Sequence, residues 1–591
     1  MENIKEEIKD KSEKYENTNL KIYDYMKKDN INTNDKALTY FGRQMVYNEF
    51  LDAIEKLAIS FKMLGIEKGD YVPICLPNIP QGVISFYALN KIGAIPNMVP
   101  VLASEEEFKH YLSEVPAKNF IMFRDFYYKV KDILPKTSID RTIIASPTTY
   151  IPTDAIKQMA SIKSIAQSCY FDAQTKFSFR NKLMSWDKLM NLSDGENRVV
   201  TESFKFNDTA LLSHTGGTTG IPKSAEFTNE NFNAMVEQYR VLVDSFERGD
   251  KILTVLPMFI NYGLCNNIHM PLSFGIETII VPTFDPKEAF DLFTKYRPNH
   301  FMCVSHYFEY MMNDPRFDGF DLSFLKTVTY GGAPLSPESK NQFDKFLEEH
   351  GAIGVKICNG YGMTETTSSI AYEYKAKNGD EYKLFQLPYT DIKIVNPDSK
   401  KEVEIGEVGE LCASGPVIFK GYLNNIDETN NVLKVHSDGK KWLHSGDLAV
   451  LNSDLSINIV GKIKRIYPTM DTSNGNVAKI FPDNIENVIK TCSCVKECAV
   501  ECKQDIERVN IPLAFIVLND GYSNETAIEL LKNKCLELNS YSRPYNFIFV
   551  NNILKTGGGK VDHKVLEKLI PDNYKESIPE IVYEYSNRKV K

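Results

Sequence analysis

The stretch Ser213–Ser224, SHTGGTTGIPKS, decides the fold of this chain. It sets glycines and threonines before a proline and a lysine: Thr215, Gly216, Gly217, Thr218, Thr219, Gly220, Pro222 and Lys223. Glycine lets backbone N–H groups turn toward an anion, and threonine hydroxyls and a lysine ammonium can complete a cradle for phosphate. The ordinary P-loop has Gly directly before Lys, where this chain has Pro222, so this loop is of another kind. Taken alone, a Gly/Thr surface turn fits the same residues equally well.

The segments around this loop indicate a parallel sheet. Thr209–Leu212 has the pattern of a short buried strand, and Thr228 or Asn229 can cap a helix that follows the loop. Earlier in the chain, a predicted helix from Gln81 to near Gly93 leads into a predicted strand, Ala94–Met98. Alternation of strands and helices favours a parallel sheet with helices on its faces.

The residues from Thr215 to Lys223 resemble the phosphate-loop signature of the adenylate-forming superfamily, (S/T)-(S/G)-G-T-T-G-x-P-K-G. This superfamily comprises acyl-CoA synthetases, amino-acid adenylation domains and beetle luciferases. Ser224 stands where the signature has its closing glycine. Further segments resemble family motifs in the family's order: KILTVLPMFINYGL (251–264), FLKTVTYGGAPLS (324–336), VKICNGYGMTETT (355–367), KWLHSGDLAVLN (441–452), INIVGKIKRIY (457–467) and ILKTGGGKVDHKVLEK (553–568). The resemblance covers about residues 37–568, and we identify the chain as a member, closest to acyl-CoA synthetases.

The resemblance implies an α/β fold in two domains. Residues 1–463 are expected to form a large ATP- and acid-binding domain of doubly wound sheets plus a small β-rich layer. Residues 464–591 are expected to form a smaller, mobile α/β domain that turns about a hinge at Lys464 and carries a catalytic lysine, Lys560. Ligands of open parallel sheets bind beyond the carboxyl ends of the strands, so the strand ends at Thr215, Gly331 and Tyr361 are expected to meet at one crevice.

The implied reaction joins a carboxylate to ATP, releases pyrophosphate and leaves an acyl-adenylate. Because two anions meet, charge compensation dominates its barrier. The resemblance assigns phosphate and nucleotide binding to Thr215, Gly216, Gly217, Thr218, Thr219, Gly220, Lys223, Gly332 and Lys462, adenine to Asn359 and Tyr361, and ribose to Asp447. Catalysis falls to Thr364 at the α-phosphate, to Glu365 as ligand of Mg²⁺, and to Lys560 on the reacting carboxylate. Lys462 replaces the family's arginine, and the two differ at forked contacts.

The resemblance also places an acid pocket, which is mostly apolar. Its expected lining is Phe259, Ile260, Tyr262, Ser305, His306, Gly331 and Met363. Ile260 stands where the family commonly has a histidine, which favours an apolar acid, a fatty acid in particular, over an amino acid. His306 could contact this substrate or serve a purely structural role.

Three functions stay possible: an enzyme that passes the acyl group to coenzyme A, an enzyme that passes it to a carrier protein, and a binding protein without catalytic activity. The expected acceptor of the acyl group is coenzyme A, and the alternative is a pantetheine on a separate carrier protein. Several extra residues at 469–476 alter the segment that lines the CoA entrance in CoA ligases, which weakens the inference to CoA. A catalytically silent binding protein is the third reading, and the intact Lys223, Glu365, Asp447 and Lys560 oppose it.

Composition restricts the partners and the compartment. The 591 residues are 43% hydrophobic and 25% charged with a net charge of −9 and no basic run, so a nucleic-acid partner is not expected. The amino-terminus is polar and no apolar run reaches ~18–20 residues, so neither a signal peptide nor a membrane span is predicted. Eleven cysteines without paired spacing are typical of reduced thiols in a cytoplasmic protein. The cluster Cys492, Cys494, Cys498 and Cys502 lacks zinc-type spacing and is predicted to be structural.

Two regions carry weaker patterns. Residues 1 to about 35 are predicted to be a poorly packed lead-in with a first helix. The polar stretch 167–197 is longer than a tight connection needs, and we interpret it as a surface excursion that holds Trp186.

Overall fold

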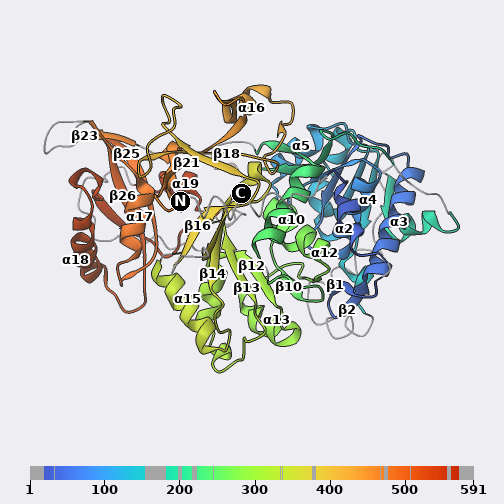
Figure 1. The fold of residues 1–591 in the computed structure, drawn as a ribbon, viewed down its shortest axis with the longest axis horizontal. Coiled ribbons are helices and arrows are strands. Elements are labelled where there is room, and N and C mark those ends of the chain that lie inside the picture. The colour runs from blue at the N-terminus through green and yellow to red at the C-terminus, as the bar shows by residue number, and fades with distance from the viewer. Residues whose placement is uncertain are drawn as a thin grey trace.

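The computed structural model of the protein describes residues 19–31, 33–152, 182–196, 202–215, 222–243, 245–332, 335, 337–375, 381–465, 467–470, 477–505, 508–555 and 561–570. The fold contains two large mixed sheets, a smaller antiparallel sheet and a carboxy-terminal unit (Figure 1). The α/β fold with large sheets and a smaller second domain is therefore as predicted. Among the described residues, no helix combines the length and apolar composition that crossing a bilayer requires.

The larger of the two mixed sheets has a parallel centre and antiparallel edges. Its strands run in the order β16 (Tyr382–Gln386), β15 (Ser369–Lys375), β14 (Ile357–Gly362), β13 (Thr327–Gly331), β12 (His300–Val304), β10 (Lys251–Thr254), β11 (Glu277–Ile280), β1 (Lys36–Tyr40) and β2 (Arg43–Val46). Strands β10 to β14 are joined in parallel. Their short apolar runs are buried, as expected for parallel strands covered on both faces.

The second mixed sheet carries the phosphate loop between two of its strands. Its order is β19 (Gly421–Tyr422), β9 (Ser224–Thr228), β8 (Thr209–His214), β4 (Ile95–Met98), β3 (Tyr71–Cys75), β5 (Asn119–Phe123), β6 (Arg141–Ala145) and β7 (Lys182–Ser185). Strands β8 and β9 are antiparallel, so residues 215–223 form the connection at their end. The predicted helix before Gly93, the predicted strand after it and the predicted strand before the loop are confirmed.

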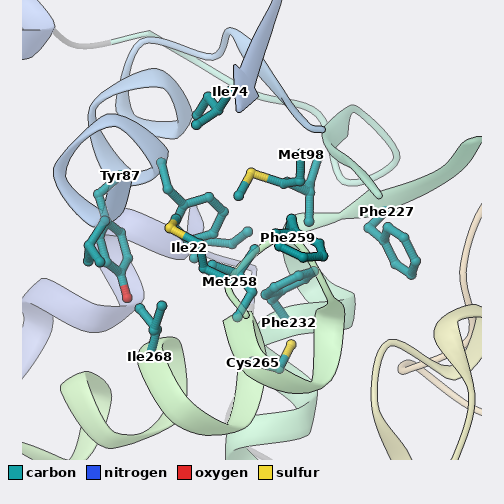
Figure 2. Close-up of a cluster of buried hydrophobic side chains, with 14 of the residues drawn as sticks. Ile22, Ile74, Tyr87, Met98, Phe227, Phe232, Met258, Phe259, Cys265 and Ile268 are labelled. Carbon is teal, nitrogen blue, oxygen red and sulfur yellow. The ribbon is translucent and has the colours of Figure 1, made fainter. Parts of the chain in front are cut away.

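Helices cover these sheets: those between residues 22 and 242 pack into a main hydrophobic core, and those between residues 289 and 349 pack into a second hydrophobic cluster. The principal ones are α2 (Ile22–Lys28), α3 (Tyr47–Met63), α4 (Pro80–Lys91), α5 (Glu105–Ser113), α9 (Trp186–Met190), α10 (Asn229–Leu242), α13 (Ala289–Tyr296), α14 (Ser305–Met312) and α15 (Pro337–Glu349). Every residue of α4 is buried, as in a helix packed on all sides. Figure 2 shows side chains from α2, α4, α10 and the strands meeting in the main core, among them Ile22, Tyr87 and Phe232.

Helix α10 begins where the sequence predicted it. The Thr228 hydroxyl accepts a hydrogen bond from the Asn231 backbone N–H (3.3 Å), and the Asn231 side chain accepts one from the Thr228 N–H (2.8 Å). This reciprocal cap satisfies two N–H groups that the helix itself leaves without partners. It therefore holds the start of α10 directly after β9.

The β-rich layer and the carboxy-terminal unit lie beyond the large sheets. The layer consists of β17 (Asp391–Val395), β18 (Val408–Ser414), β21 (Lys441–Leu451), β20 (Leu433–Val435) and β22 (Ile457–Lys462), with α16 (Ile426–Val432) beside it. The carboxy-terminal unit contains β23 (Tyr467–Met470), β24 (Val477–Ile480), α17 (Pro482–Lys490), β25 (Val495–Asp505), β26 (Val509–Leu518), α18 (Asn524–Lys534), β27 (Asn546–Phe549) and α19 (His563–Lys568). It has its own hydrophobic core around Ile485 and Ile516.

Two predictions about packing are wrong. Helix α2 is not poorly packed, because Ile22, Tyr23 and Met26 are fully buried in the main core. Trp186 is only 2% exposed and packs in the same core, so the described end of the 167–197 stretch is not a surface excursion. Residues 167–181 lie outside the described residues. In both places burial follows from distant contacts that local polarity does not report.

The cysteine cluster is buried, as a structural cluster should be. Cys492 and Cys494 lie in the turn before β25, with their sulfur atoms 3.3 Å apart, and Cys498 lies on that strand. All three belong to the core of the carboxy-terminal unit. Burial raises the pKa of the Cys494 thiol to about 12, which keeps it protonated at neutral pH.

Buried histidines predict a loss of stability in mild acid. His269 is fully buried between Tyr87 and Asn233 (3.1 and 3.3 Å), and burial lowers the pKa of its imidazole from 6.5 to about 3. The unfolded chain therefore binds a proton below pH 6.5 that the folded chain does not bind until about pH 3. The stabilisation from neutral His269 is complete above pH 6.5 and declines as the pH falls toward 3. Between pH 7.5 and 5.5 we expect a loss of about 1.4 kcal/mol from this residue.

The measurement is the free energy of unfolding at both pH values. The variant His269→Gln should start less stable but should lose about 1.4 kcal/mol less on acidification than the wild type. His350→Gln, at a partly exposed position, should lose as much as the wild type. Equal losses for all three proteins would contradict the assignment.

Candidate active site

The two ends of the phosphate loop are held together at the edge of the second sheet. The Thr215 backbone N–H donates to the Lys223 carbonyl (2.9 Å), and the Lys223 N–H donates to the Thr215 hydroxyl (3.2 Å). The loop residues between them, Gly216, Gly217, Thr218, Thr219 and Gly220, lie outside the described residues. Their predicted contacts with phosphate stay predictions.

Ser224, the departure from the family signature, has a structural use. Its hydroxyl bonds His214 Nδ1 (2.9 Å) across the strand pair and also contacts the Glu114 carboxylate. His214 Nε2 in turn bonds the Asn97 side-chain oxygen (2.7 Å). A glycine could not make this connection, so the serine adds a side-chain link beneath the loop.

Glu365 and Lys223 meet at a residue that sequence reasoning left unassigned, Tyr422. The Tyr422 hydroxyl donates to Glu365 Oε1 (2.6 Å), and Lys223 Nζ lies 4.6 Å from the centre of the Tyr422 ring. The only available signal was the position of Tyr422 in the segment GPVIFKGYLNN, within which no chemistry-bearing type stood out. Thr364 precedes Glu365 in a short 3-10 turn, Thr364–Thr366.

The Glu365 carboxylate fits the expected magnesium ion. It is 8% exposed, its Oε1 is occupied by Tyr422, and its Oε2 makes no hydrogen bond within the described part of the chain. A carboxylate oxygen left free in this way is the hard ligand that Mg²⁺ prefers. Glu365 would hold the ion, and the Tyr422 hydroxyl would orient the carboxylate.

Two residues predicted to bind the nucleotide, Tyr361 and Lys462, contact Asp447, the predicted ribose ligand. This carboxylate is 7% exposed, accepts a hydrogen bond from the Tyr361 hydroxyl at Oδ2 (2.7 Å) and forms an ion pair with Lys462 at Oδ1. Burial, and next the Asp447 charge, raise the pKa of Tyr361, so its hydroxyl stays a donor. The structure thus brings together Tyr361, Asp447 and Lys462, which the sequence assigned to one nucleotide, and Asn359 lies on the same strand as Tyr361.

The irregular part of strand β21 that carries Asp447 is held by a buried carboxylate. Glu410 Oε1 accepts from the Gly446 N–H (3.2 Å), and Oε2 accepts from His444 Nδ1 (2.7 Å). Together with Cys412, these two side chains bring metal-type donor atoms within 4.8 Å of one another. However, His444 Nε2 also bonds His436 Nε2 (3.0 Å), so both carboxylate oxygens and both His444 nitrogens already have partners. We therefore interpret the cluster as a structural support for the segment of β21 that carries Asp447.

Two residues of the predicted acid pocket, Tyr262 and Gly331, lie next to each other. A Cβ at Gly331 would lie 3.2 Å from the Tyr262 ring and 3.1 Å from the Gly360 carbonyl, so any larger residue would press on the tyrosine and on the Gly360 backbone. Gly332 follows with a φ of 83°, which favours glycine. The Tyr262 hydroxyl is buried without a hydrogen-bond partner among the described residues.

The other predicted pocket residues lie on three further segments, and their grouping into one pocket stays a prediction. Phe259 and Ile260 precede helix α11 (Asn261–Leu264), Ser305 opens α14 with 7% exposure, and Met363 follows β14. The side chain of His306 is not described, so its two readings stay open. Directly after α11 a π-helical segment, Cys265–His269, widens the helix, a feature that is frequent at functional sites.

The structure describes little of the two lysines that the predicted domain rotation involves. Lys560 belongs to residues 556–560, which are not described. Lys464 lies in a short 3-10 segment, Ile463–Arg465, after β22, but its side chain is not described. The hinge role and the catalytic role of these lysines stay predictions.

Comparison with known proteins identifies the family. The family model of the AMP-binding enzymes matches residues 28–423, two thirds of the chain. The chain belongs to the AMP-binding enzyme family. The model of the AMP-binding enzyme C-terminal domain matches residues 484–560. The predicted membership of the adenylate-forming superfamily is confirmed, and so is the prediction of an AMP-forming enzyme.

Curated relatives of this AMP-binding enzyme span nearly its whole length. A long-chain-fatty-acid–CoA ligase of Bacillus subtilis (strain 168) is 27% identical over 527 residues, which are 89% of this chain and 90% of the relative. A 4-coumarate–CoA ligase 2 of Petroselinum crispum is 26% identical over 542 residues, 90% of each chain. The two relatives carry names with an aliphatic and an aromatic acid.

Solved structures share the fold of this AMP-binding enzyme. ATP bound MatB from Rhodopseudomonas palustris superposes with a TM-score of 0.77 at 20% identity, covering 94% of this chain and 99% of that one. The anthranilate CoA ligase AuaEII in complex with anthranoyl-AMP gives a TM-score of 0.77 at 19% identity, covering 93% and 97%. At this identity the likeness concerns the fold alone.

Proposed function

We propose that this AMP-binding enzyme activates a small-molecule carboxylic acid with ATP and passes the acyl group to the thiol of coenzyme A. The observation that carries the proposal is the group Tyr361, Asp447 and Lys462, a ribose-type carboxylate held by a phenol and a lysine. Family membership supplies the reaction class, and the names of the relatives, all CoA ligases in the two cases above, support CoA as acceptor.

The first half-reaction forms a phosphorus–oxygen bond. A carboxylate oxygen of the acid attacks the α-phosphorus of ATP, the bond from that phosphorus to the bridging oxygen breaks, and pyrophosphate leaves. Lys223 would neutralise the departing phosphates, and Thr364 would donate to the α-phosphate. Mg²⁺, when bound at Glu365, would neutralise further phosphate charge. Lys560 would offset the negative charge that builds up between carboxylate and phosphate.

The second half-reaction forms the thioester. The thiol sulfur attacks the acyl carbon, AMP leaves, and the thiol proton passes to solvent. We propose that residues 1–463 hold the adenylate while residues 464–591 rotate about Lys464 between the half-reactions. A pantetheine on a carrier protein is the alternative acceptor, favoured only by the altered segment at 469–476.

The substrate is either an apolar acid or an aryl acid with a polar substituent, and the Tyr262 hydroxyl distinguishes the two. Phe259, Ile260 and Met363 favour an apolar acid such as a fatty acid. The buried Tyr262 hydroxyl without a partner favours an aryl acid that carries a polar substituent, because such a group would satisfy it. We propose the apolar acid first and the substituted aryl acid second.

The test is pyrophosphate release with Mg²⁺ and ATP over fatty and aryl acids, with and without CoA. With a fatty acid, rates should rise with chain length until the pocket is full, since each buried methylene contributes about 1 kcal/mol. Thioester formation should require CoA. Absence of both ATP binding and pyrophosphate release across the panel would leave only the silent binding protein.

A tyrosine variant distinguishes the two acid classes. Tyr262→Phe removes the hydroxyl that has no partner in the described structure and keeps the ring against Gly331. If the acid is apolar, kcat/KM should stay the same or rise. If the acid bonds the hydroxyl, kcat/KM for that acid should fall about tenfold or more, while the unsubstituted analogue keeps its rate. The measurement is kcat/KM for matched acids with and without a hydroxyl group.

A further inference from the structure

Tyr422 lies at the junction of three functional segments. In the short strand β19 it pairs with Ala225 of β9, directly after the phosphate loop. Its backbone N–H donates to the Thr429 hydroxyl of helix α16 (2.9 Å). These two contacts hold the tyrosine backbone rigidly between the loop strand and α16.

The hydroxyl end of Tyr422 reaches the predicted metal ligand. It donates to Glu365 Oε1, and the Phe419 N–H two residues before β19 donates to the Glu365 carbonyl (2.9 Å). Tyr422 is 6% exposed, so little water competes with this hydrogen bond to the carboxylate.

The ring face of Tyr422 lies against the lysine of the phosphate loop. Lys223 Nζ is 4.6 Å from the ring centroid, within the range of a cation–π contact. The same ammonium forms an ion pair with Glu428 of α16. Both side chains of this pair are more than one third exposed, 36% for Lys223 and 40% for Glu428, so an arriving anion can displace the carboxylate.

We propose that Tyr422 is a positioning residue that couples the phosphate-loop lysine to the metal-binding carboxylate, and that Glu428 is the counter-ion Lys223 exchanges for nucleotide phosphate. The proposal rests on the proposed function, since it takes ATP as the ligand. When phosphate replaces Glu428, the tyrosine ring keeps the ammonium in place while its hydroxyl keeps one Glu365 oxygen turned away from the metal. The phosphate-loop lysine and the Glu365 carboxylate would thereby be positioned relative to each other before ATP and Mg²⁺ bind.

The first test uses Tyr422→Phe, which deletes only the hydroxyl. Titration calorimetry compares the affinity for ATP in EDTA with the affinity for ATP and Mg²⁺. Loss of an outer-shell partner typically weakens metal binding 10–100-fold, so we expect a loss of that order in the Mg²⁺-dependent part. ATP binding in EDTA and AMP binding should match the wild type, because the ring and the Asp447 group are intact.

The outcomes separate this inference from the proposed function. If the wild type binds no ATP, the proposed function fails. If the wild type binds ATP and Mg²⁺ and the phenylalanine variant binds both equally well, only the coupling through Tyr422 is wrong. A uniform loss that includes AMP would show a general structural role and would also overturn the coupling.

The second test uses Glu428→Gln, which removes the counter-ion and keeps the shape of the side chain. Exposed ion pairs contribute little, so freeing Lys223 should tighten ATP binding in EDTA only about twofold to fivefold, with AMP binding unchanged. Asp427→Asn is the matched control, because it removes one negative charge from the adjacent, exposed position of α16. Equal tightening in both variants, or none in Glu428→Gln, would overturn the exchange.

Discussion

Replacing Lys560 with alanine is expected to slow adenylate formation about 10²–10³-fold, because loss of one well-placed charge contact in a transition state typically has that effect. ATP binding should change little, since Thr215, Lys223 and Asp447 all belong to the large domain. Transfer of a preformed acyl-adenylate to the thiol should also persist. The measurement is pyrophosphate release and thioester formation, assayed separately on one preparation.

Lys555→Ala is the matched control for this result. Lys555 lies on the same connection between β27 and α19 and forms an ion pair with Glu497 (3.0 Å) on β25, within the carboxy-terminal unit. Both half-reactions should therefore stay close to the wild-type rates. If Lys560→Ala damaged both half-reactions equally, or neither, the division of labour between the two domains would be wrong.

Local patterns were enough to predict the strands of the sheets, and the family resemblance assigned Tyr361, Asp447 and Lys462 to one nucleotide, three residues that the structure brings together. The segments around Gly93 and Thr228 have local signals, an apolar run or a helix cap, that the structure retains. Asp447 and Tyr361 could be paired because each stands in a family motif, although 86 residues separate them. Local patterns and the resemblance therefore agree at the described residues of these segments.

What the sequence could not predict depends on contacts between distant segments. Tyr422 gains its place from β9, α16 and Glu365 together, and no spacing in the chain reveals that meeting. Glu410 accepts a hydrogen bond from the backbone N–H of Gly446, and a pattern of side-chain types does not reveal such a contact. Trp186 was misjudged because its polar surroundings in sequence hide its burial in the main core. These residues support the site without holding its ligands.

Arg465→Leu is expected to destabilise the carboxy-terminal domain by about 3–5 kcal/mol, the range seen when one partner of a buried ion pair is removed. The guanidinium is 14% exposed and pairs with the Asp483 and Glu486 carboxylates, and it also donates to the Val500 carbonyl (2.7 Å). Burial raises the pKa of Asp483, which shows how poorly solvated that carboxylate is. Leucine fills the space but leaves a half-buried and a buried acid, Asp483 and Glu486, without their cation.

Because of the position of Arg465, the Arg465→Leu substitution should reduce the rate of adenylate formation as well as the stability of the domain. It directly follows Lys464, and its partners begin helix α17, whose residue Ile485 lies in the core of the carboxy-terminal unit. Local unfolding of this unit would withdraw Lys560, so adenylate formation should fail while ATP binding to the large domain persists. Lys490→Leu is the matched control, because Lys490 also approaches Glu486 (3.7 Å) but is 35% exposed, and its removal should change stability by less than about 1 kcal/mol.

Hydrogen exchange of backbone amides in β25 and β26 measures the effect within the domain itself. Opening free energies there should fall by about 3–5 kcal/mol in Arg465→Leu, while amides of β10 and β12 in the large domain keep their protection. The large domain thus serves as an internal reference in the same sample. Unchanged protection in β25, or an equal loss in both domains, would mean that the Arg465 cluster does not hold the carboxy-terminal domain together.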